Sequence, residues 1–388
     1  MPNNMERKPI LRFPEFTDDW EQRKLGDIFE YEQPGPYIVS STEYSDNFTT
    51  PVLTAGQSFI LGYTNEKKGI KTATSENPVI IFDDFTTTSH LVNFNFKVKS
   101  SAIKILSLNN KKDNIYCANS VLKNIRYIPA NHERHWISKF ANFSVFMPSC
   151  LEEQKKIGDF IKLFDELIDL YYKKIQILKR IKKGFLQKLF PKKDEINPEL
   201  RFPGFTDDWE HQNLGFFFDE RLERAKENEE LLSVTISNGV IKQKYSEKRN
   251  VASEDKSNYK IVKKGDVPYN SMRMWQGAVG VSKYDGIVSP AYTVLVPKDI
   301  TNGKFFMEFF KKDSTLEIFK RWSQGLTSDT WNLKFHVLSS IHCNAPSIEE
   351  QNKIAEFLFK LDQFIIFHQR KIEILQNIKK GLLQQMFV

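Results

Sequence analysis

Two stretches of the chain carry apolar side chains on a seven-residue repeat. Alternating spacings of three and four residues place such side chains on one stripe of a helix, so the pattern predicts a long helix with an a/d seam. In residues 152–190 one register of the repeat holds Ile157, Phe164, Tyr171, Leu178 and Phe185. The other register holds Ile161, Ile168, Ile175 and Leu189, with Lys182 as its interruption.

Residues 349–388 carry the same pattern. Its two registers are Ile354, Leu361, His368, Leu375 and Leu382, and Leu358, Ile365, Ile372, Lys379 and Met386. A helix of about 38 residues is roughly 57 Å long, too long to be buried in one domain, so we expect the two helices to pair with each other. The alternative is two separate amphipathic helices, each on its own domain. His368, at the place of Tyr171, either fixes the helix register or is a partly exposed histidine.

The chain also contains a sequence duplication. Residues 11–21, Leu-Arg-Phe-Pro-Glu-Phe-Thr-Asp-Asp-Trp-Glu, return as residues 200–210 with glycine in place of one glutamate, and the Glu-Glu-Gln of 152–154 returns at 349–351. The segments between, roughly 25–148 and 214–346, show no evident similarity. A duplicated frame with two different inserts is typical of a protein that recognises two different things.

Gly184 and Gly381 lie at equivalent positions near the ends of the two predicted helices. They predict a close backbone crossing or a C-cap.

The inserts have the pattern of mixed, strand-rich domains. Short β-branched or aromatic runs at 78–82, 102–106 and 292–296 predict strands, and Phe305–Phe310 predicts a helix. Pro191–Glu199 combines prolines and charges and is interpreted as a linker. The fold class expected is therefore α+β, with two mixed domains and two long helices that pair with each other.

Composition adds little to this picture. The 388 residues include three cysteines (Cys117, Cys150, Cys343) without CxxC spacing, and no leader-like start or membrane-length apolar run, so a cytoplasmic protein is expected. Most of the net charge of +7 lies in residues 152–193. An insert that contacts DNA must therefore do so through a local basic surface.

The sequence shows none of the common catalytic motifs. It has no GxxxxGK[ST], GxGxxG or HExxH, and no Asn-Pro-Pro or Asp-Pro-Pro tetrapeptide of the amino-methyltransferases. Asp83-Asp84 is the best carboxylate pair for a metal ion, but no third ligand follows at a recognisable spacing, and a solvated turn is the favoured interpretation. We expect a protein that is not an enzyme and binds no metal.

Both inserts hold donors and aromatic side chains of the kinds that contact DNA. Arginine or lysine can bind guanine, and asparagine or glutamine can bind adenine, in the major groove. In the second insert the candidates are Asn270, Arg273, Trp275 and Gln276, followed by Arg321, Gln324, Thr327, Trp331 and Asn332. In the first insert they are Gln57, Tyr63, Asn65, Lys67, Lys68 and Lys71, followed by Lys123, Arg126 and Arg134. The alternative is that they are ordinary surface residues.

The whole arrangement resembles the specificity subunits of Type I restriction-modification systems. Each insert ends in a Pro-x-x-Glu-Glu-Gln type of entry into a long helix, although the first copy departs from this by one residue at Pro148–Glu152. Each helix ends in Lys-Lys-Gly-x-Leu-Gln-x-x-Phe, at 182–190 and 379–387. The likeness covers nearly the whole chain and occurs twice.

The resemblance implies a non-catalytic DNA-binding subunit. Its two mixed domains would be separated by two long antiparallel helices, and its halves would be related by a pseudo-two-fold axis. The expected domains are target recognition domains at 1–148 and 200–346, spacer helices at 149–190 and 347–388, and a linker at 191–199. The expected partners are double-stranded DNA with a bipartite, asymmetric site, two methylation subunits that modify adenine, and restriction subunits. S-adenosylmethionine, ATP and magnesium would be bound by those partners and not by this chain. Half-sites about 10 base pairs apart would face one side of the duplex, and the target adenine would leave the stack to be methylated.

Three other interpretations remain open at this point. The chain could be a nuclease or methyltransferase whose motif has drifted, a coiled-coil scaffold without a DNA role, or the recognition subunit of a methylation-only complex. The resemblance also suggests that the Leu-Arg-Phe-Pro repeats and the outer faces of the helices bind the methylation subunits.

Overall fold

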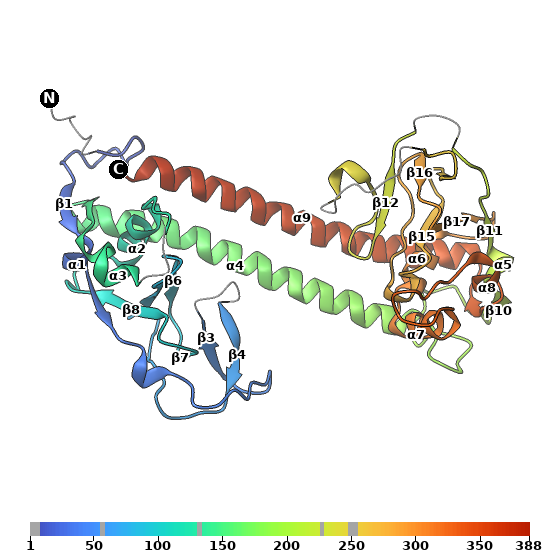
Figure 1. The fold of residues 1–388 in the computed structure, drawn as a ribbon, viewed down its shortest axis with the longest axis horizontal. Coiled ribbons are helices and arrows are strands. Elements are labelled where there is room, and N and C mark those ends of the chain that lie inside the picture. Colours follow the sequence, from blue (N-terminus) through green and yellow to red (C-terminus); the bar gives the residue numbers. More distant parts are fainter. Residues whose placement is uncertain (1–7, 55–58, 130–133, 226–228, 247–254) are drawn as a thin grey trace. The chain divides into compact units, whose positions relative to one another are not determined.

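The two heptad stretches form the long helices α4, Leu151–Lys188, and α9, Ile348–Met386. A computed structural model describes residues 8–54, 59–129, 134–225, 229–246 and 255–388 (Figure 1). The chain divides into two units, and each long helix contributes to both. Unit 1 comprises residues 1–173 and 369–388, and unit 2 comprises residues 174–368. Acidic residues in the first turn of each helix, such as Glu152 and Glu349, stabilise it because they lie at the positive end of the helix dipole.

Within each unit, one end of α4 packs antiparallel against the opposite end of α9. In unit 1 Asp165 pairs with Lys379, and the Lys371 ammonium lies 3.4 Å from the Tyr171 hydroxyl. In unit 2 the Lys182 ammonium lies 2.7 Å from an Asp362 carboxylate oxygen, and the rings of Phe185 and Phe357 are 4.8 Å apart. Residue numbers thus rise along one helix as they fall along the other, which confirms the predicted antiparallel pairing.

The heptad positions face inward on both helices. On α4 the positions from Ile157 to Phe185 are buried or half-buried, including Lys182, and on α9 those from Ile354 to Met386 are as well. Lys182 interrupts the apolar seam at little cost because two carboxylates, of Asp362 and Glu308, bind its ammonium. His368 is buried in the seam of unit 2, so the alternative of a partly exposed histidine was wrong.

Unit 1 holds the first insert in antiparallel and mixed sheets. Its strands are β1 (Glu21–Lys24), β2 (Phe29–Glu32), β3 (Thr50–Leu53), β4 (Ile60–Thr64), β5 (Val79–Asp83), β6 (Ser89–Val92), β7 (Lys97–Val98), β8 (Ile103–Leu108) and β9 (Ser144–Met147). Its short helices are α1 (Leu25–Ile28), α2 (Ile115–Asn124) and α3 (His135–Ser138). The sheet order is β2-β8-β5-β6, with β4-β3-β7 and the ladder β1-β9 beside it. The runs predicted as strands at 78–82 and 102–106 are therefore confirmed.

The run Val79–Phe82 is apolar at every position because both faces of β5 are covered. Ile80 and Phe82 enter the core that also contains Trp20, Trp136 and the first turns of α4. Val79 and Ile81 enter a second core with Leu53 and Phe96. The central sheet thus lies between two hydrophobic cores.

Unit 2 has the same frame around a different insert. Its strands are β10 (Glu210–Asn213), β11 (Phe218–Glu220), β12 (Leu232–Thr235), β13 (Gly239–Lys242), β14 (Lys260–Val262), β15 (Val267–Asn270), β16 (Gly286–Val288), β17 (Tyr292–Pro297) and β18 (His342–Ala345). Its short helices are α5 (Leu214–Phe217), α6 (Gly303–Phe310), α7 (Asp313–Trp322) and α8 (Phe335–Leu338). The sheets are β11-β17-β15, β12-β13, β14-β16 and β10-β18. The strand at 292–296 and the helix at 305–310 are confirmed.

A repeated clamp connects each insert to the start of a long helix. The Arg12 guanidinium donates two hydrogen bonds of 2.7 Å to the Glu153 carboxylate, and the Trp20 indole N–H lies 3.3 Å from it. In unit 2 Arg201 donates bonds of 2.9 and 2.6 Å to Glu350, and the Trp209 indole lies 3.2 Å away. Both glutamates are almost fully buried. The hydrogen bonds to the carboxylates raise the pKa of both arginines.

The glutamine that follows each clamp glutamate connects a second pair of segments. Gln154 accepts from the Asn114 backbone N–H at 3.0 Å and donates to the Pro148 carbonyl at 2.9 Å. Gln351 accepts from Asn302 N–H at 2.9 Å and donates to the Pro346 carbonyl at 2.9 Å. Asn114 and Asn302 are the N-cap residues of α2 and α6, so these two helices are equivalent. The repeated Glu-Glu-Gln motif is thus structural.

Each repeated N-terminal motif also binds the end of the other copy's long helix. The backbone N–H of Leu11 donates to the Gln385 carbonyl near the end of α9, and that of Leu200 donates to the Lys188 carbonyl at the end of α4, both at 2.9 Å. The Phe387 ring packs on Trp20, and the Phe190 ring packs on Trp209. The C-terminal residues of each helix are therefore part of a domain core.

Candidate nucleic-acid interface

The structure brings together the two segments of the second insert that were predicted separately to contact DNA. The turn after β15 contains Arg273, Trp275 and Gln276, and the loop after α7 contains Gln324 to Asn332. The rings of Trp275 and Trp331 meet edge to face with centroids 5.3 Å apart. The Arg273 guanidinium lies 3.6 Å from an Asp329 carboxylate oxygen. The two segments form one surface, which we call the tryptophan cluster: Arg273, Trp275, Gln276, Gln324, Trp331 and Asn332.

Backbone contacts hold the tryptophan cluster in place. The backbone N–H of Leu333 donates to the Ser271 carbonyl at 2.9 Å, and the buried Tyr269 hydroxyl donates to the Leu333 carbonyl at 2.9 Å. Gln324 and Asn332 exchange backbone hydrogen bonds of 3.0 and 2.8 Å across the neck of the loop. Burial raises the pKa of Tyr269, so its hydroxyl stays a neutral donor at physiological pH.

Some candidates of this set have their polar groups occupied. The Asn270 side-chain oxygen accepts from the Met272 N–H at 3.0 Å, and the Trp275 indole donates to the Met272 carbonyl at 3.2 Å. Thr327 forms a tight turn with Thr330. The Asn332 side-chain oxygen, in contrast, is buried and makes no hydrogen bond within the described residues. Since a buried acceptor without a donor is costly, it is an atom to which a ligand could donate.

Arg321 lies elsewhere in unit 2. It occupies the last turn of α7 and lines a different depression, together with Lys312 and His342. Burial lowers the pKa of Lys312 to about 8. The structure therefore does not join Arg321 to the tryptophan cluster.

In unit 1 the first group of candidates lies around β4. Tyr63 is in the strand, and Asn65, Lys67 and Lys68 are exposed in the loop after it. Lys71 is half-buried and pairs with Glu32, so its charge is already compensated. Gln57 lies outside the described residues.

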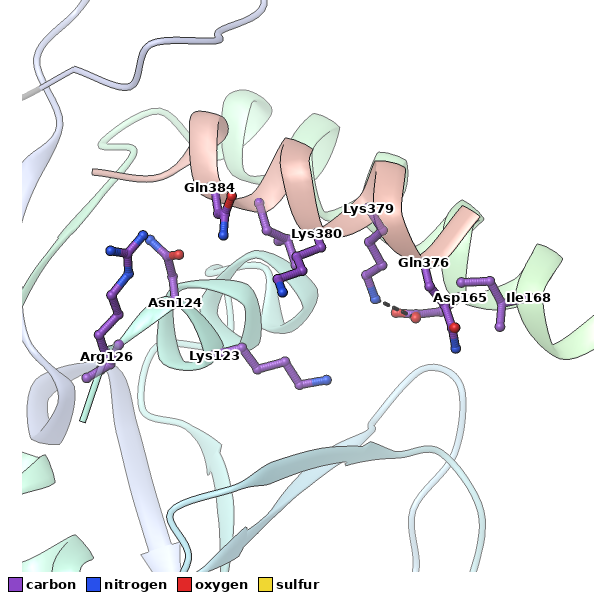
Figure 2. A pocket seen from close by; sticks show the side chains of 11 residues that line it. Lys123, Asn124, Arg126, Asp165, Ile168, Gln376, Lys379, Lys380 and Gln384 are labelled. Atoms are coloured by element: carbon purple, nitrogen blue, oxygen red, sulfur yellow. Dashed lines mark hydrogen bonds and ion pairs between the residues drawn. The ribbon is translucent and has the colours of Figure 1, made fainter. Parts of the chain in front are cut away.

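The second group of DNA-contact candidates in unit 1, Lys123, Arg126 and Arg134, lies in two separate places. Lys123 and Arg126 line a depression at the end of α2, which is also lined by Lys379 and Lys380 of α9 (Figure 2). Arg134 is exposed at the start of α3 and donates to the Ser101 hydroxyl at 3.3 Å. The sequence assigned Lys379 to the helix seam and left Lys380 unassigned. The Lys-Lys-Gly motif repeated at the two helix ends could have indicated these lysines as candidates. The sequence does not show, however, that they lie beside Lys123.

Asp83 and Asp84 have structural roles, and the expectation of a solvated turn was wrong because both side chains are buried. The Asp83 carboxylate accepts from the backbone N–H groups of Phe85 and Thr86 at 2.9 and 3.1 Å, which closes a turn. The fully buried Asp84 accepts from the Trp136 N–H at 2.8 Å and lies 3.4 Å from the Lys104 ammonium. Among the described residues, no group of three or more histidine, cysteine, aspartate or glutamate side chains could hold a metal ion. In the same residues, no helix is long and apolar enough to cross a membrane.

Comparison with known proteins agrees with the duplicated frame. The family model described as the Type I restriction modification DNA specificity domain matches twice, over residues 17–180 and 208–377. The specificity subunit of the Type I restriction enzyme MjaVIII from Methanocaldococcus jannaschii is 25% identical over 98% of this chain and 94% of its own length. That of EcoR124I/EcoR124II from Escherichia coli is 40% identical, over 38% of this chain and 37% of its own length.

A solved structure shares the fold over the whole chain. The crystal structure of the S subunit of a Type I restriction-modification system from M. genitalium superposes with a TM-score of 0.63 and 16% identity, covering 98% of this chain and 99% of that one. The two matches of the family model together span most of the chain and coincide with the two copies of the frame. The chain therefore belongs to the family of Type I restriction-modification specificity subunits.

Proposed function

We propose that this chain is a non-catalytic subunit that recognises a bipartite, asymmetric DNA site and directs adenine methylation and restriction by partner subunits. The observation that carries the proposal is the repeated clamp. The same Arg-Glu-Trp arrangement and the same glutamine contacts hold two inserts whose sheets differ. Two different surfaces on one duplicated frame fit two different half-sites.

The residues proposed to contact bases in the second half-site belong to the tryptophan cluster. Arg273, Gln276 and Gln324 supply side-chain donors beside two aromatic rings, which suits hydrogen bonding to base edges. For the first half-site the corresponding proposal rests on Tyr63, Asn65, Lys67 and Lys68, with Lys71, Arg134 and the undescribed Gln57 as further candidates. S-adenosylmethionine, ATP and magnesium would be bound by the partner subunits.

The proposal is tested by sequencing N6-methyladenine in a host without other modification systems that expresses this chain with its cognate methylation subunit. We expect one bipartite motif with a fixed gap. Replacing residues 214–346 by the insert of a relative should change one half-motif and leave the other, because each insert is held by its own clamp. A matched exchange of residues 25–148 should change only the other half.

New methylation at a single undivided motif would contradict the bipartite site. No methylation from a stable complex would favour the scaffold alternative. Absence of a restriction-subunit gene from the genome that encodes this chain would identify a methylation-only complex.

The long helices carry a second apolar stripe, which we propose as the surface for the methylation subunits. On α4 it comprises Leu163, Leu170, Ile177 and Ile181, and on α9 Phe364, Phe367, Ile374 and Ile378, all of them exposed. Leu170, Ile177 and Ile181 are equivalent to Phe367, Ile374 and Ile378 in the repeat. Exposed apolar patches of this kind usually mark interaction sites. Because the stripe is duplicated, its partner should bind in two copies.

Gly184 and Gly381 extend the same stripe on each helix. The expectation that they allow a close crossing within the chain or cap a helix was wrong. Both lie inside their helices. Apart from the neighbouring residues and the nearby backbone of its own helix, no described atom lies within 4 Å of a Cβ built on either glycine. The space beside each glycine is therefore free for a partner to approach closely.

The double substitution Leu163→Glu and Leu170→Glu should remove one of two bound methylation subunits. These side chains are 60% and 59% exposed, so the fold should lose less than about 0.5 kcal/mol of stability. Native mass spectrometry of the mixture should then show one copy bound instead of two. Gln176→Glu, an exposed position of α4 outside the stripe, is the control and should keep both. Two copies bound to the double variant with unchanged affinity would refute this surface.

A further inference from the structure

A cationic depression of about 480 Å³ lies in unit 1, where α2 ends beside α9. We call it the basic depression, and Figure 2 shows Lys379, Lys380 and Gln384 extending from α9 toward the side where Lys123 leaves α2. Arg126 follows on the chain after α2 and lines the same depression. Four cations thus face one carboxylate, that of Asp165. The side chains come from three parts of the chain that are far apart in sequence.

Only one of these cations has an acidic partner. Lys379 pairs with Asp165, as the dashed line in Figure 2 marks. Lys123, Arg126 and Lys380 form no ion pair with any residue that the structure describes. Partial desolvation, together with the charge of Lys379, lowers the pKa of Lys123. An anion bound here would relieve this repulsion.

The repeat offers an internal comparison, because unit 2 holds the equivalent residues. The equivalence of the N-caps Asn114 and Asn302 makes Lys311 the counterpart of Lys123, and Glu308 the counterpart of Ser120. Lys182 and Asp362 are the counterparts of Lys379 and Asp165.

In unit 2 two carboxylates of the same chain lie beside Lys182, the counterpart of Lys379. The Lys182 ammonium lies 3.0 Å from Glu308 and 2.7 Å from Asp362. Although burial opposes it, the two carboxylates raise the pKa of Lys182. Unit 1 has no such second carboxylate, because the small hydroxyl of Ser120 stands where Glu308 does and donates to the Tyr116 carbonyl. Unit 1 therefore has one carboxylate beside Lys379 where unit 2 has two beside Lys182.

We propose that the basic depression binds a backbone phosphate of DNA, so that unit 1 anchors the duplex by a contact that unit 2 lacks. Lysine and arginine with neighbouring amides, here Gln384 and Asn124, are the usual phosphate-binding set. A phosphate contact positions DNA without reading its sequence. The inference rests on the proposed DNA binding and adds an asymmetry between the units.

The test compares two charge-matched double variants of the assembled methylation complex. Lys123→Gln with Lys380→Gln removes two charges from the basic depression, and Lys311→Gln with Lys183→Gln removes two from the equivalent place in unit 2. DNA affinity is measured by fluorescence anisotropy between 50 and 300 mM salt. Each lost phosphate contact reduces the slope of log affinity against log salt by about 0.9.

We expect the unit 1 variant to lower the magnitude of this slope by roughly one and to weaken binding about tenfold at 0.1 M salt, with the methylated motif unchanged. The unit 2 variant should keep the wild-type slope. Equal slopes for all three proteins would overturn the proposal, as would loss of the methylation subunit from the unit 1 variant. Binding of inorganic phosphate at the depression, seen by ³¹P line broadening, with an unchanged DNA slope would identify a free-anion site and also overturn it. A wild-type complex with a clear salt slope but no sequence preference would instead refute the proposed function alone.

Discussion

Glu350→Ala is expected to lower the free energy of unfolding of unit 2 by about 3–5 kcal/mol, because it leaves the Arg201 guanidinium without its buried carboxylate. The Glu350 side chain is 1% exposed and accepts from both Arg201 and Trp209. The loss would be read from the urea midpoint of the unfolding transition, followed by tryptophan fluorescence. Glu153→Ala should have the same effect on unit 1, since its clamp is equivalent.

Glu349→Ala is the matched control for this experiment. Glu349 is the preceding residue of the same first helical turn but is exposed, so its removal should cost only the weak dipole interaction, about 0.3–1 kcal/mol. A double variant, Arg201→Met with Glu350→Leu, should recover most of the stability because no buried charge is left unpaired. Equal midpoints for Glu350→Ala and Glu349→Ala would show that the clamp contributes nothing.

Phe387→Ala should destabilise unit 1 by about 3–5 kcal/mol, although it changes the last residue but one of the chain. The Phe387 ring packs edge to face on Trp20 at 5.9 Å and belongs to the main core of unit 1. Differential scanning calorimetry would show the transition of unit 1 at a lower temperature. Phe190→Ala should act in the same way on unit 2, where Phe190 packs on Trp209.

Val388→Ala is the control for the helix end, because Val388 is 46% exposed. Its substitution should leave the transition unchanged. If Phe387→Ala behaves like Val388→Ala, the end of α9 does not contribute to the core of unit 1.

The Leu-Arg-Phe-Pro repeats illustrate what a repeated motif does and does not reveal. The resemblance suggested that they bind the methylation subunits. In the structure each arginine binds a glutamate of its own chain, 141 residues away for Arg12 and 149 for Arg201. The duplication indicated that the motifs have a role, but only the tertiary structure showed that each arginine binds a glutamate of its own chain. The exposed stripe of the helices remains as the proposed docking surface.

The sequence by itself determined the two long helices, their pairing with each other, the duplicated frame and the presence of two different inserts. These follow from periodicity and from self-similarity, which are properties of segments and need no knowledge of distant contacts. The family followed from the same repeated motifs. The strands at 78–82 and 292–296 could also be predicted, because short runs of β-branched and aromatic residues favour strands.

The tertiary structure alone decided which side chains meet. It joined Trp275 to Trp331 but placed Arg321 in another depression, and it set Lys123 beside Lys379 and Lys380, which are more than 250 positions away in sequence. It also put Glu308 next to Lys182 in one unit and Ser120 at the same place in the other. No local sequence pattern predicts these pairs, because each pair joins residues from elements that are separate in the sequence. Two such residues come into contact only when both elements have packed in the folded chain.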